Sequence, residues 1–347
     1  MKENNLLKNA ALGYSLIRTL NFNLQSRALP IIAQIFSDPK KNKKIDLSEH
    51  MKIAQPKIEK LLRQDAENIA HGDYPISVLK PENLISHAAR IPFVYVDAVR
   101  SALRRRKNES KKFDKTQTDL LKELPAYYRR NFHFQTDGYL GEASAQLYEH
   151  QVEILFSGAA GAMRRMIIPQ MKKHFKDSDG EGLKFLEIGS GTGSLTKYVA
   201  LAFPKAQITC LDLSHEYLKL AQENLKNFKR VNYTQGAGEK TDFKSASFDA
   251  VFSCFLFHEL PSAIRLEMTH EAHRILKPQG LFGCVDSLQY NDDPEFNWAL
   301  DQFPVDFHEP FFKDYTRKPV DQIMKKYKFN HIETQLGFLA KCVTGIK

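Results

Sequence analysis

Apolar residues recur at helical spacing through the first 170 residues of the chain. Leu6-Leu7, Ala10-Ala11, Tyr14 and Ile17 fall three or four positions apart, the period of a helix buried along one face. The same spacing continues in further segments, at about 24–36, 48–72, 81–106, 143–156 and 163–175. Charged sequence over 104–118 predicts a linker. This half of the chain is therefore expected to be helical, with a region 1–118 and a bridge 119–176.

The pattern changes after residue 177. Short apolar runs near 183–188, 206–212, 247–254 and 274–282 are separated by segments of helical periodicity. Two more runs, near 331–336 and 338–344, follow a helix expected over about 316–327. Strands that alternate with helices are typical of an α/β fold built on a largely parallel sheet. We therefore treat 177–347 as one α/β domain.

The first of these strands leads into a glycine-rich turn. Gly189, Gly191 and Gly193 occupy every second position, immediately before a helix-like run over 194–200. Glycine allows a tight turn and lets a ligand approach the backbone closely. One acidic residue, Glu187, ends the strand, and another, Asp212, ends the next strand. This layout predicts a site for a nucleotide-type cofactor.

The alternate glycines resemble motif I, E/D-x-G-x-G-x-G, of the class I S-adenosylmethionine-dependent methyltransferases. The resemblance continues in order over about 183–290: 247–261 is similar to the fourth strand and its loop, and 274–282 to the turn before strand five. It implies a Rossmann-like α/β fold, with a mixed seven-stranded sheet ending in an antiparallel hairpin, and S-adenosylmethionine as cofactor. The cofactor-binding residues that it implies are Glu187, Gly189, Ser190, Gly191, Gly193, Asp212, Leu213, Ala237, Gly238, Glu239 and Cys254.

The resemblance also assigns roles within this set. Asp212 matches the acidic residue that binds both ribose hydroxyls, and a carboxylate can accept from two vicinal hydroxyls at once. Family members often carry Gly-Asp-Ala-Glu where this chain reads Gly236-Ala237-Gly238-Glu239. The missing aspartate normally accepts from the adenine amino group, which Ala237 cannot do. Glu239, a backbone carbonyl or apolar packing is expected to take over that role.

Aromatic residues before the glycine turn are candidates for the acceptor side of the site. In many small-molecule methyltransferases the preceding segment closes over cofactor and substrate. The expected substrate-binding residues are Tyr128, Phe132, Phe134, Tyr139, Phe255 and Phe311. The alternative is that these rings belong to the core.

Two histidines are candidate catalytic residues. His258 follows the fourth strand and His308 precedes the C-terminal helix; either imidazole is able to accept a proton from a hydroxyl, with an ordinary pKa of about 6.5. The alternatives are a packing role for His258 and a helix-start role for His308. Methyl transfer depends chiefly on positioning in a dry site, so neither a base nor a metal is required.

Composition bears on location and partners. No apolar run approaches the length of a membrane helix, and the four cysteines are widely spaced without a CxxC pair, which favours reduced thiols in a cytoplasmic protein. Residues 1–130 hold 25 Lys and Arg against 14 Asp and Glu, whereas 131–347 hold 25 against 27. The basic clusters, at 40–44 and 104–112, are expected to be solvated helix ends and linker, so nucleic acid is not an expected partner. Whether the helical region forms a homodimer stays open.

The sequence therefore favours a methyltransferase that acts on a small, apolar or aromatic acceptor. Two alternatives remain open at this point. One is a methyltransferase for RNA or protein that docks through the basic helical region. The other is a non-catalytic protein that binds S-adenosylmethionine.

Overall fold

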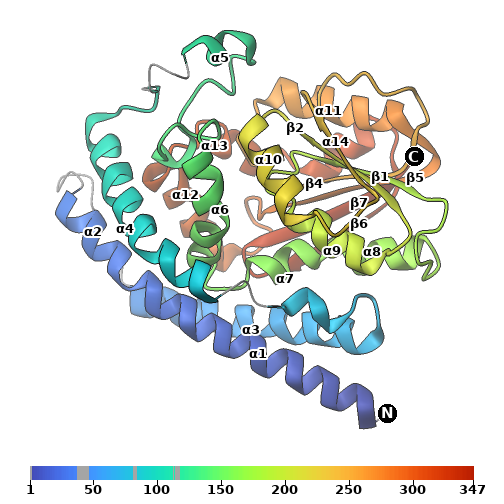
Figure 1. Ribbon diagram of the computed structural model, residues 1–347, viewed down its shortest axis with the longest axis horizontal. Coiled ribbons are helices and arrows are strands. Elements are labelled where there is room, and N and C mark those ends of the chain that lie inside the picture. The colour runs from blue at the N-terminus through green and yellow to red at the C-terminus, as the bar shows by residue number, and fades with distance from the viewer. Residues whose placement is uncertain (1, 37–46, 81–83, 112, 114–117) are drawn as a thin grey trace.

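The computed structural model describes residues 2–36, 47–80, 84–111, 113 and 118–347. Its centre is one seven-stranded mixed sheet with the order β3-β2-β1-β4-β5-β7-β6 (Figure 1). β7 runs antiparallel to both of its neighbours, and the other pairs are parallel. The expected sheet with its antiparallel C-terminal hairpin is confirmed. The strands are β1 (Lys184–Ile188), β2 (Gln207–Asp212), β3 (Val231–Gln235), β4 (Phe248–Cys254), β5 (Leu276–Ser287), β6 (Asn330–Gly337) and β7 (Ala340–Ile346).

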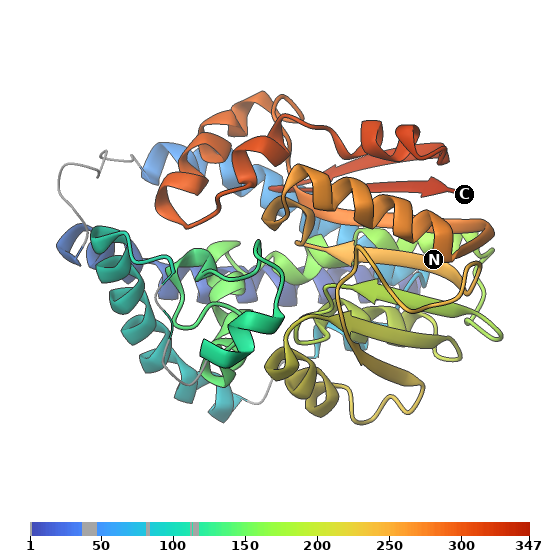
Figure 2. The same cartoon turned by 90° about the horizontal axis from the view of Figure 1, so that it is seen from above.

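Helices cover both faces of this sheet (Figure 2). Adjacent residues of one strand face opposite layers: Phe185 joins the core under α8 and α9, whereas Leu186 joins the core under α11 and α14. The strand order reverses between β1 and β4, which is where open α/β sheets bind ligands beyond the carboxyl ends of their strands. The helices of the two layers are α7 (Ala160–Arg165), α8 (Ile167–His174), α9 (Ser194–Ala202), α10 (His215–Asn224), α11 (Ser262–Ile275) and α14 (Val320–Lys326).

The N-terminal half is helical, as expected. α1 lies along α3, α4 lies against α2 and α6, and α3 reaches α7 and β6 (Figure 1). The remaining helices are α1 (Lys2–Ser26), α2 (Ala28–Phe36), α3 (Leu47–His71), η1 (Ile76–Leu79), α4 (Leu84–Lys107), α5 (Thr118–Glu123), η3 (Phe132–Phe134), α6 (Glu142–Leu155), η4 (Phe257–Glu259), η5 (Pro294–Phe296), α12 (Asn297–Asp306) and α13 (Phe312–Thr316).

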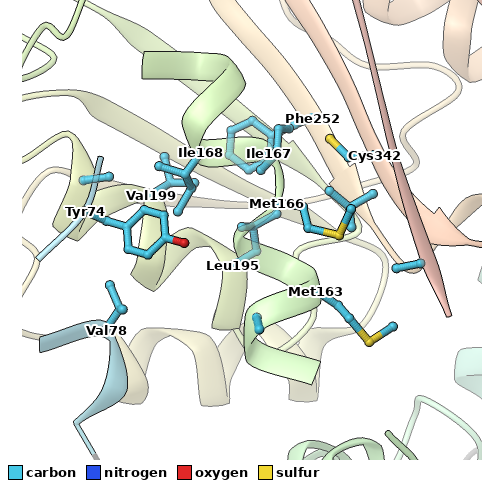
Figure 3. Close-up of a cluster of buried hydrophobic side chains, with 14 of the residues drawn as sticks. Tyr74, Val78, Met163, Met166, Ile167, Ile168, Leu195, Val199, Phe252 and Cys342 are labelled. Atoms are coloured by element: carbon cyan, nitrogen blue, oxygen red, sulfur yellow. The ribbon is translucent and has the colours of Figure 1, made fainter. Parts of the chain in front are cut away.

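One buried core joins the N-terminal helices to the sheet. Figure 3 shows Tyr74 and Val78, near η1, beside side chains of α7, α8, α9 and β4. At the same junction Arg165 makes two hydrogen bonds to Asp65, of 2.8 and 2.7 Å, and both side chains are 2% exposed. The Tyr74 hydroxyl donates to the same carboxylate. Removing one partner of a buried pair costs about 3–5 kcal/mol, so this pair anchors α3 to α7.

Three expected elements have different bounds. α4 continues through Lys107, so the first residues of the expected linker are helical, with Ala102 buried one turn earlier. The segment 163–175 forms two helices. The N–H of Met166 donates to the carbonyl of Met163, three residues earlier, which tightens the backbone between them into a 3₁₀-type turn. The expected helix over 316–327 begins later, as α14 at Val320, because Pro319 disfavours helix at the residue before it. The expected start at Pro81 lies outside the described residues.

The cysteines lie in strands, as the sequence suggested. Cys210, Cys254, Cys284 and Cys342 fall in β2, β4, β5 and β7, and all four are free thiols. Across the described part of the chain, no helix has both the length and the apolar character required to cross a bilayer.

Candidate cofactor and acceptor site

The glycine turn connects β1 to α9 at the reversal point of the sheet. Gly191 and Gly193 have φ values of +52° and +81°, in the left-handed region that favours glycine. A Cβ on Gly193 would lie 2.6 Å from Leu225, so this position serves the close packing of the turn. A Cβ on Gly191 would meet nothing closer than Tyr217, at 3.8 Å. Gly191 therefore leaves open space at the surface of a cavity.

Asp212 connects the end of β2 to this turn. Its two carboxylate oxygens accept backbone N–H groups of Gly191 and Ser214, each at 2.8 Å. Burial raises the pKa of Asp212 to about 6. Glu187 has a different environment: it accepts the Thr196 hydroxyl of α9, and burial raises its pKa to about 8. Asp212 thus shapes the turn and reaches the cavity, whereas Glu187 is held against α9.

The cavity has walls from two parts of the chain. It contains about 730 Å³ of empty space, part of it open to solvent. The ends of β1 and β2, the loops after β1, β2 and β3, and α10 supply Ile188, Gly189, Gly191, Asp212, Leu213, Tyr217, Gly236, Gly238 and Glu239. The bridge before the glycine turn supplies Tyr127, Tyr128, Phe132, Tyr139 and Tyr148. The segment after β4, with α11, supplies Cys254, Phe255, Leu256, Glu259, Leu260 and Met268.

Most residues expected to contact the cofactor line this cavity. They are Gly189, Gly191, Asp212, Leu213, Gly238, Glu239 and Cys254, whereas Glu187, Ser190, Gly193 and Ala237 lie outside its lining. Of the expected acceptor residues, Tyr128, Phe132, Tyr139 and Phe255 line it. Phe311 instead packs under the guanidinium of Arg130, 4.9 Å away, and the side chain of Phe134 lies outside the described residues.

The aromatic bridge is fastened to the sheet by hydrogen bonds. Tyr127 donates to Glu239 Oε1 at 2.7 Å, and the Ser214 hydroxyl donates to the carbonyl of Tyr139 at 2.6 Å. Glu239 Oε2 is buried and accepts no hydrogen bond from any described residue. These two hydrogen bonds hold the bridge over the cavity. Glu239 Oε2 remains at the cavity wall as an acceptor without a partner among the described residues.

Comparison with known proteins agrees with this geometry. Residues 185–280 match the sequence profile of a family described as a methyltransferase domain. This segment is therefore similar to a methyltransferase domain. A fatty-acid O-methyltransferase of Mycolicibacterium smegmatis is 27% identical over 50% of this chain and 58% of its own length. A malonyl-[acyl-carrier protein] O-methyltransferase of Geobacter sulfurreducens is 28% identical over 44% of this chain and 58% of its own length.

Among solved structures, a methyltransferase from Aquifex aeolicus aligns with a TM-score of 0.37 and 20% identity, over 51% of this chain and 88% of its own. The chain spans 58% of the length of each of the two curated relatives above.

The two histidines that the sequence singled out do not line the cavity of the methyltransferase domain. Burial lowers the pKa of His258, but Asp286 Oδ1 lies 2.6 Å from its Nδ1 and raises the pKa overall, to about 9. Burial, aided by the nearby Arg130, lowers the pKa of His308 to about 4. The expected titration near 6.5 is therefore wrong for both, because their surroundings shift the pKa in opposite directions.

Sequence reasoning missed an acidic cluster at the wall of the methyltransferase domain. Glu259 lines the cavity and accepts the Tyr139 hydroxyl. His133 Nε2 lies 3.4 Å from Glu259 Oε1 and 3.3 Å from Glu309 Oε1. Burial raises the pKa of Glu309 to about 7. The only sequence signal was that Glu259 and Glu309 each follow a candidate histidine directly.

Proposed function

We propose that the protein transfers a methyl group from S-adenosylmethionine to a small acceptor with an apolar or aromatic body. The supporting observation is that one cavity has walls from two parts of the chain. Gly191 and Asp212 of the methyltransferase domain form one side of it, and Tyr128, Phe132 and Tyr139 of the bridge form the other. Cofactor and acceptor would thus occupy adjoining parts of one cavity.

The residues present fit the cofactor. Each Asp212 oxygen uses one lone pair on a backbone N–H and keeps capacity for a ribose hydroxyl. Glu239 Oε2 is a buried acceptor without a partner among the described residues, which suits the adenine amino group that Ala237 cannot bind. The open space at Gly191 lets the ligand approach the backbone. These features support Asp212, Glu239 and Gly191 as the main cofactor contacts.

The cofactor supplies an electrophilic methyl group on a positively charged sulfur. The chain supplies position and a site poor in water, in which loss of that charge during transfer is favourable. The rings of Tyr128, Phe132 and Phe255 give the cavity an apolar wall. Burial raises the pKa of Cys254 well above its ordinary value, so this thiol stays protonated and does not compete as a nucleophile.

The acceptor class is inferred from the walls and the relatives together. The relatives described above are named for fatty acids and malonyl-[acyl-carrier protein], and a demethylmenaquinone methyltransferase of Staphylococcus carnosus is 31% identical over 31% of this chain and 45% of its own length. These names cover different acceptors, so the relatives do not single out one acceptor for this chain. Walls rich in Tyr and Phe support an acceptor with an apolar body for this chain.

Docking of RNA through the basic helix end receives no support from the contacts there. Arg104 donates to the Thr136 hydroxyl at 2.9 Å, and Arg105 donates to the carbonyl and carboxylate of Asp306 at 3.1 and 3.2 Å. These arginines hold α4 against the bridge and α12. The other basic cluster, at 40–44, lies outside the described residues.

The test combines binding with turnover. S-adenosylhomocysteine affinity is measured by calorimetry, and methyl transfer is followed with labelled S-adenosylmethionine over fatty acids, phenols, quinols and a malonyl thioester. We expect binding in the parent and label transfer to at least one apolar acceptor. Binding without transfer to any acceptor, bulk RNA and protein included, would indicate the non-catalytic alternative. Transfer to RNA alone would contradict the proposed acceptor class.

A further inference from the structure

Three side chains from distant parts of the chain meet beside the cavity. His133 belongs to η3, Glu259 to η4, and Glu309 to the segment between α12 and α13. One atom from each, His133 Nε2 and a carboxylate oxygen of each glutamate, lies within 4.8 Å of the other two. The Glu309 side chain is fully buried, and that of Glu259 is 9% exposed.

The separations match those of ligands around one ion. Metal–ligand bonds of about 2.0–2.2 Å place the atoms of a tetrahedral site roughly 3.3–3.6 Å apart. His133 Nε2 lies 3.4 Å from Glu259 Oε1 and 3.3 Å from Glu309 Oε1. Two of the three edges therefore already have the required length, and the Glu259–Glu309 edge is no longer than 4.8 Å.

Hydrogen bonding leaves this cluster incomplete. Neither oxygen of Glu309 has a hydrogen-bond partner among the described residues, although the side chain is fully buried. A buried carboxylate without hydrogen bonds is strongly unfavourable, and coordination of a cation relieves that cost. His133 Nε2 also lies 3.0 Å from the Tyr139 hydroxyl, so three oxygen atoms surround one nitrogen that has a single bonding position.

Metal binding would fix the charges of this cluster. Coordination requires a neutral His133 Nε2 and ionised Glu259 and Glu309, and the two negative units of that state match one divalent cation. His258 is paired with Asp286 at 2.6 Å, and its Nε2 lies 3.8 Å from Glu259 Oε1.

We propose that His133, Glu259 and Glu309 bind a divalent transition-metal ion. One imidazole and two carboxylates form a donor set suited to Zn²⁺, Mn²⁺ or Fe²⁺. The Tyr139 hydroxyl donates to Glu259 and positions that ligand, whereas its 3.0 Å contact with His133 Nε2 would give way to the metal. Glu259 and Tyr139 line the cavity, so a metal ion bound to Glu259 would be next to it. A further step rests on the proposed function: an oxygen of the acceptor would complete the coordination and be held beside the transferable methyl.

The experiment measures metal binding without turnover. Parent protein is stripped with a chelator, dialysed, and titrated with Zn²⁺ and with Mn²⁺ by calorimetry, and bound metal is then counted by elemental analysis. We expect one equivalent for at least one of these ions. Glu309→Gln, which keeps shape and volume, and His133→Ala should each weaken binding at least about 100-fold, more than loss of an outer-shell partner does.

Glu153→Gln is the matched control. Glu153 is another buried glutamate, paired with Arg18 at 2.8 Å and remote from the cavity, and it also has an unbonded carboxylate oxygen. This variant should keep the metal affinity of the parent. Circular dichroism checks that each variant is folded.

Two outcomes would overturn the proposal: no saturable binding by the parent, or equal affinities in the parent and Glu309→Gln. Titration of the same samples with S-adenosylhomocysteine separates this proposal from the proposed function. Binding of that ligand without metal refutes the metal site alone, and metal binding without that ligand refutes the proposed cofactor site alone.

Discussion

Replacing Asp212 with alanine tests the cofactor site most informatively, because the carboxylate has two roles. It holds the N–H of Gly191 at 2.8 Å, and it is the acceptor we assign to the ribose hydroxyls. A hydrogen bond to a charged group contributes about 1.5–3 kcal/mol. Loss of one such bond should therefore raise the dissociation constant of S-adenosylhomocysteine roughly 10- to 150-fold. Asp212→Asn, which keeps one acceptor oxygen, should fall between parent and alanine.

Calorimetry of the parent and these variants makes the comparison, with Asp249→Ala as control. Asp249 is also a strand carboxylate that accepts a backbone N–H, from Lys184 at 2.9 Å, but it pairs with Lys277 and does not line the cavity. We expect Asp249→Ala to bind as the parent does, even if it is less stable. Asp212→Ala should remain folded, because burial already disfavours its ionised form. Unchanged affinity in a folded Asp212→Ala would refute the assignment of this carboxylate to the ribose.

Three further predictions concern the same cavity. Gly191→Val should abolish measurable binding, because a β-branched residue is strained at φ +52° and its side chain would fill ligand space. Gly13→Val is the control: Gly13 lies in a helix with open space around it, so this variant should bind normally. S-adenosylhomocysteine affinity should decline as pH falls below about 6, the raised pKa of Asp212, because the carboxyl becomes protonated. The decline should be about tenfold per pH unit below that pKa. A flat profile down to pH 5, or the same decline in Asp212→Asn, would count against this prediction. Glu239→Ala should weaken S-adenosylhomocysteine binding about tenfold, because its free oxygen is the acceptor we assign to the adenine amino group. Tyr127→Phe removes only the 2.7 Å hydrogen bond to that glutamate and should weaken binding less. A larger loss of affinity in Tyr127→Phe than in Glu239→Ala would contradict the assignment.

Local patterns were sufficient for six of the seven strands and for the cofactor side of the cavity, whereas β3 was expected only from the family resemblance. The strand preceding Gly189, the turn itself and Asp212 are close in sequence or end neighbouring strands, so spacing and hydrophobic pattern predict their proximity. The cavity lining includes most of the residues named on that basis. The cysteine-bearing strands were predictable for the same reason, since each is a short apolar run.

Contacts between distant segments could not be predicted in this way. Whether His133, Glu259 and Glu309 meet depends on how the bridge and the segment after α12 close over the sheet, which no periodicity encodes. The pKa of His258 depends on Asp286, which lies 28 residues later in β5. The basic residues at 104–105 looked like linker, but their partners, Thr136 and Asp306, hold α4 in place.

The most direct test of the central claim is a calorimetric titration of the parent with S-adenosylhomocysteine and, separately, with NAD. The left-handed turn at Gly191, the carboxylate of Asp212 and the unused oxygen of Glu239 predict saturable binding of the sulfur ligand at one site. That binding should be lost in Gly191→Val, and NAD should give no comparable response. Tight binding of NAD with no response to S-adenosylhomocysteine would contradict the account.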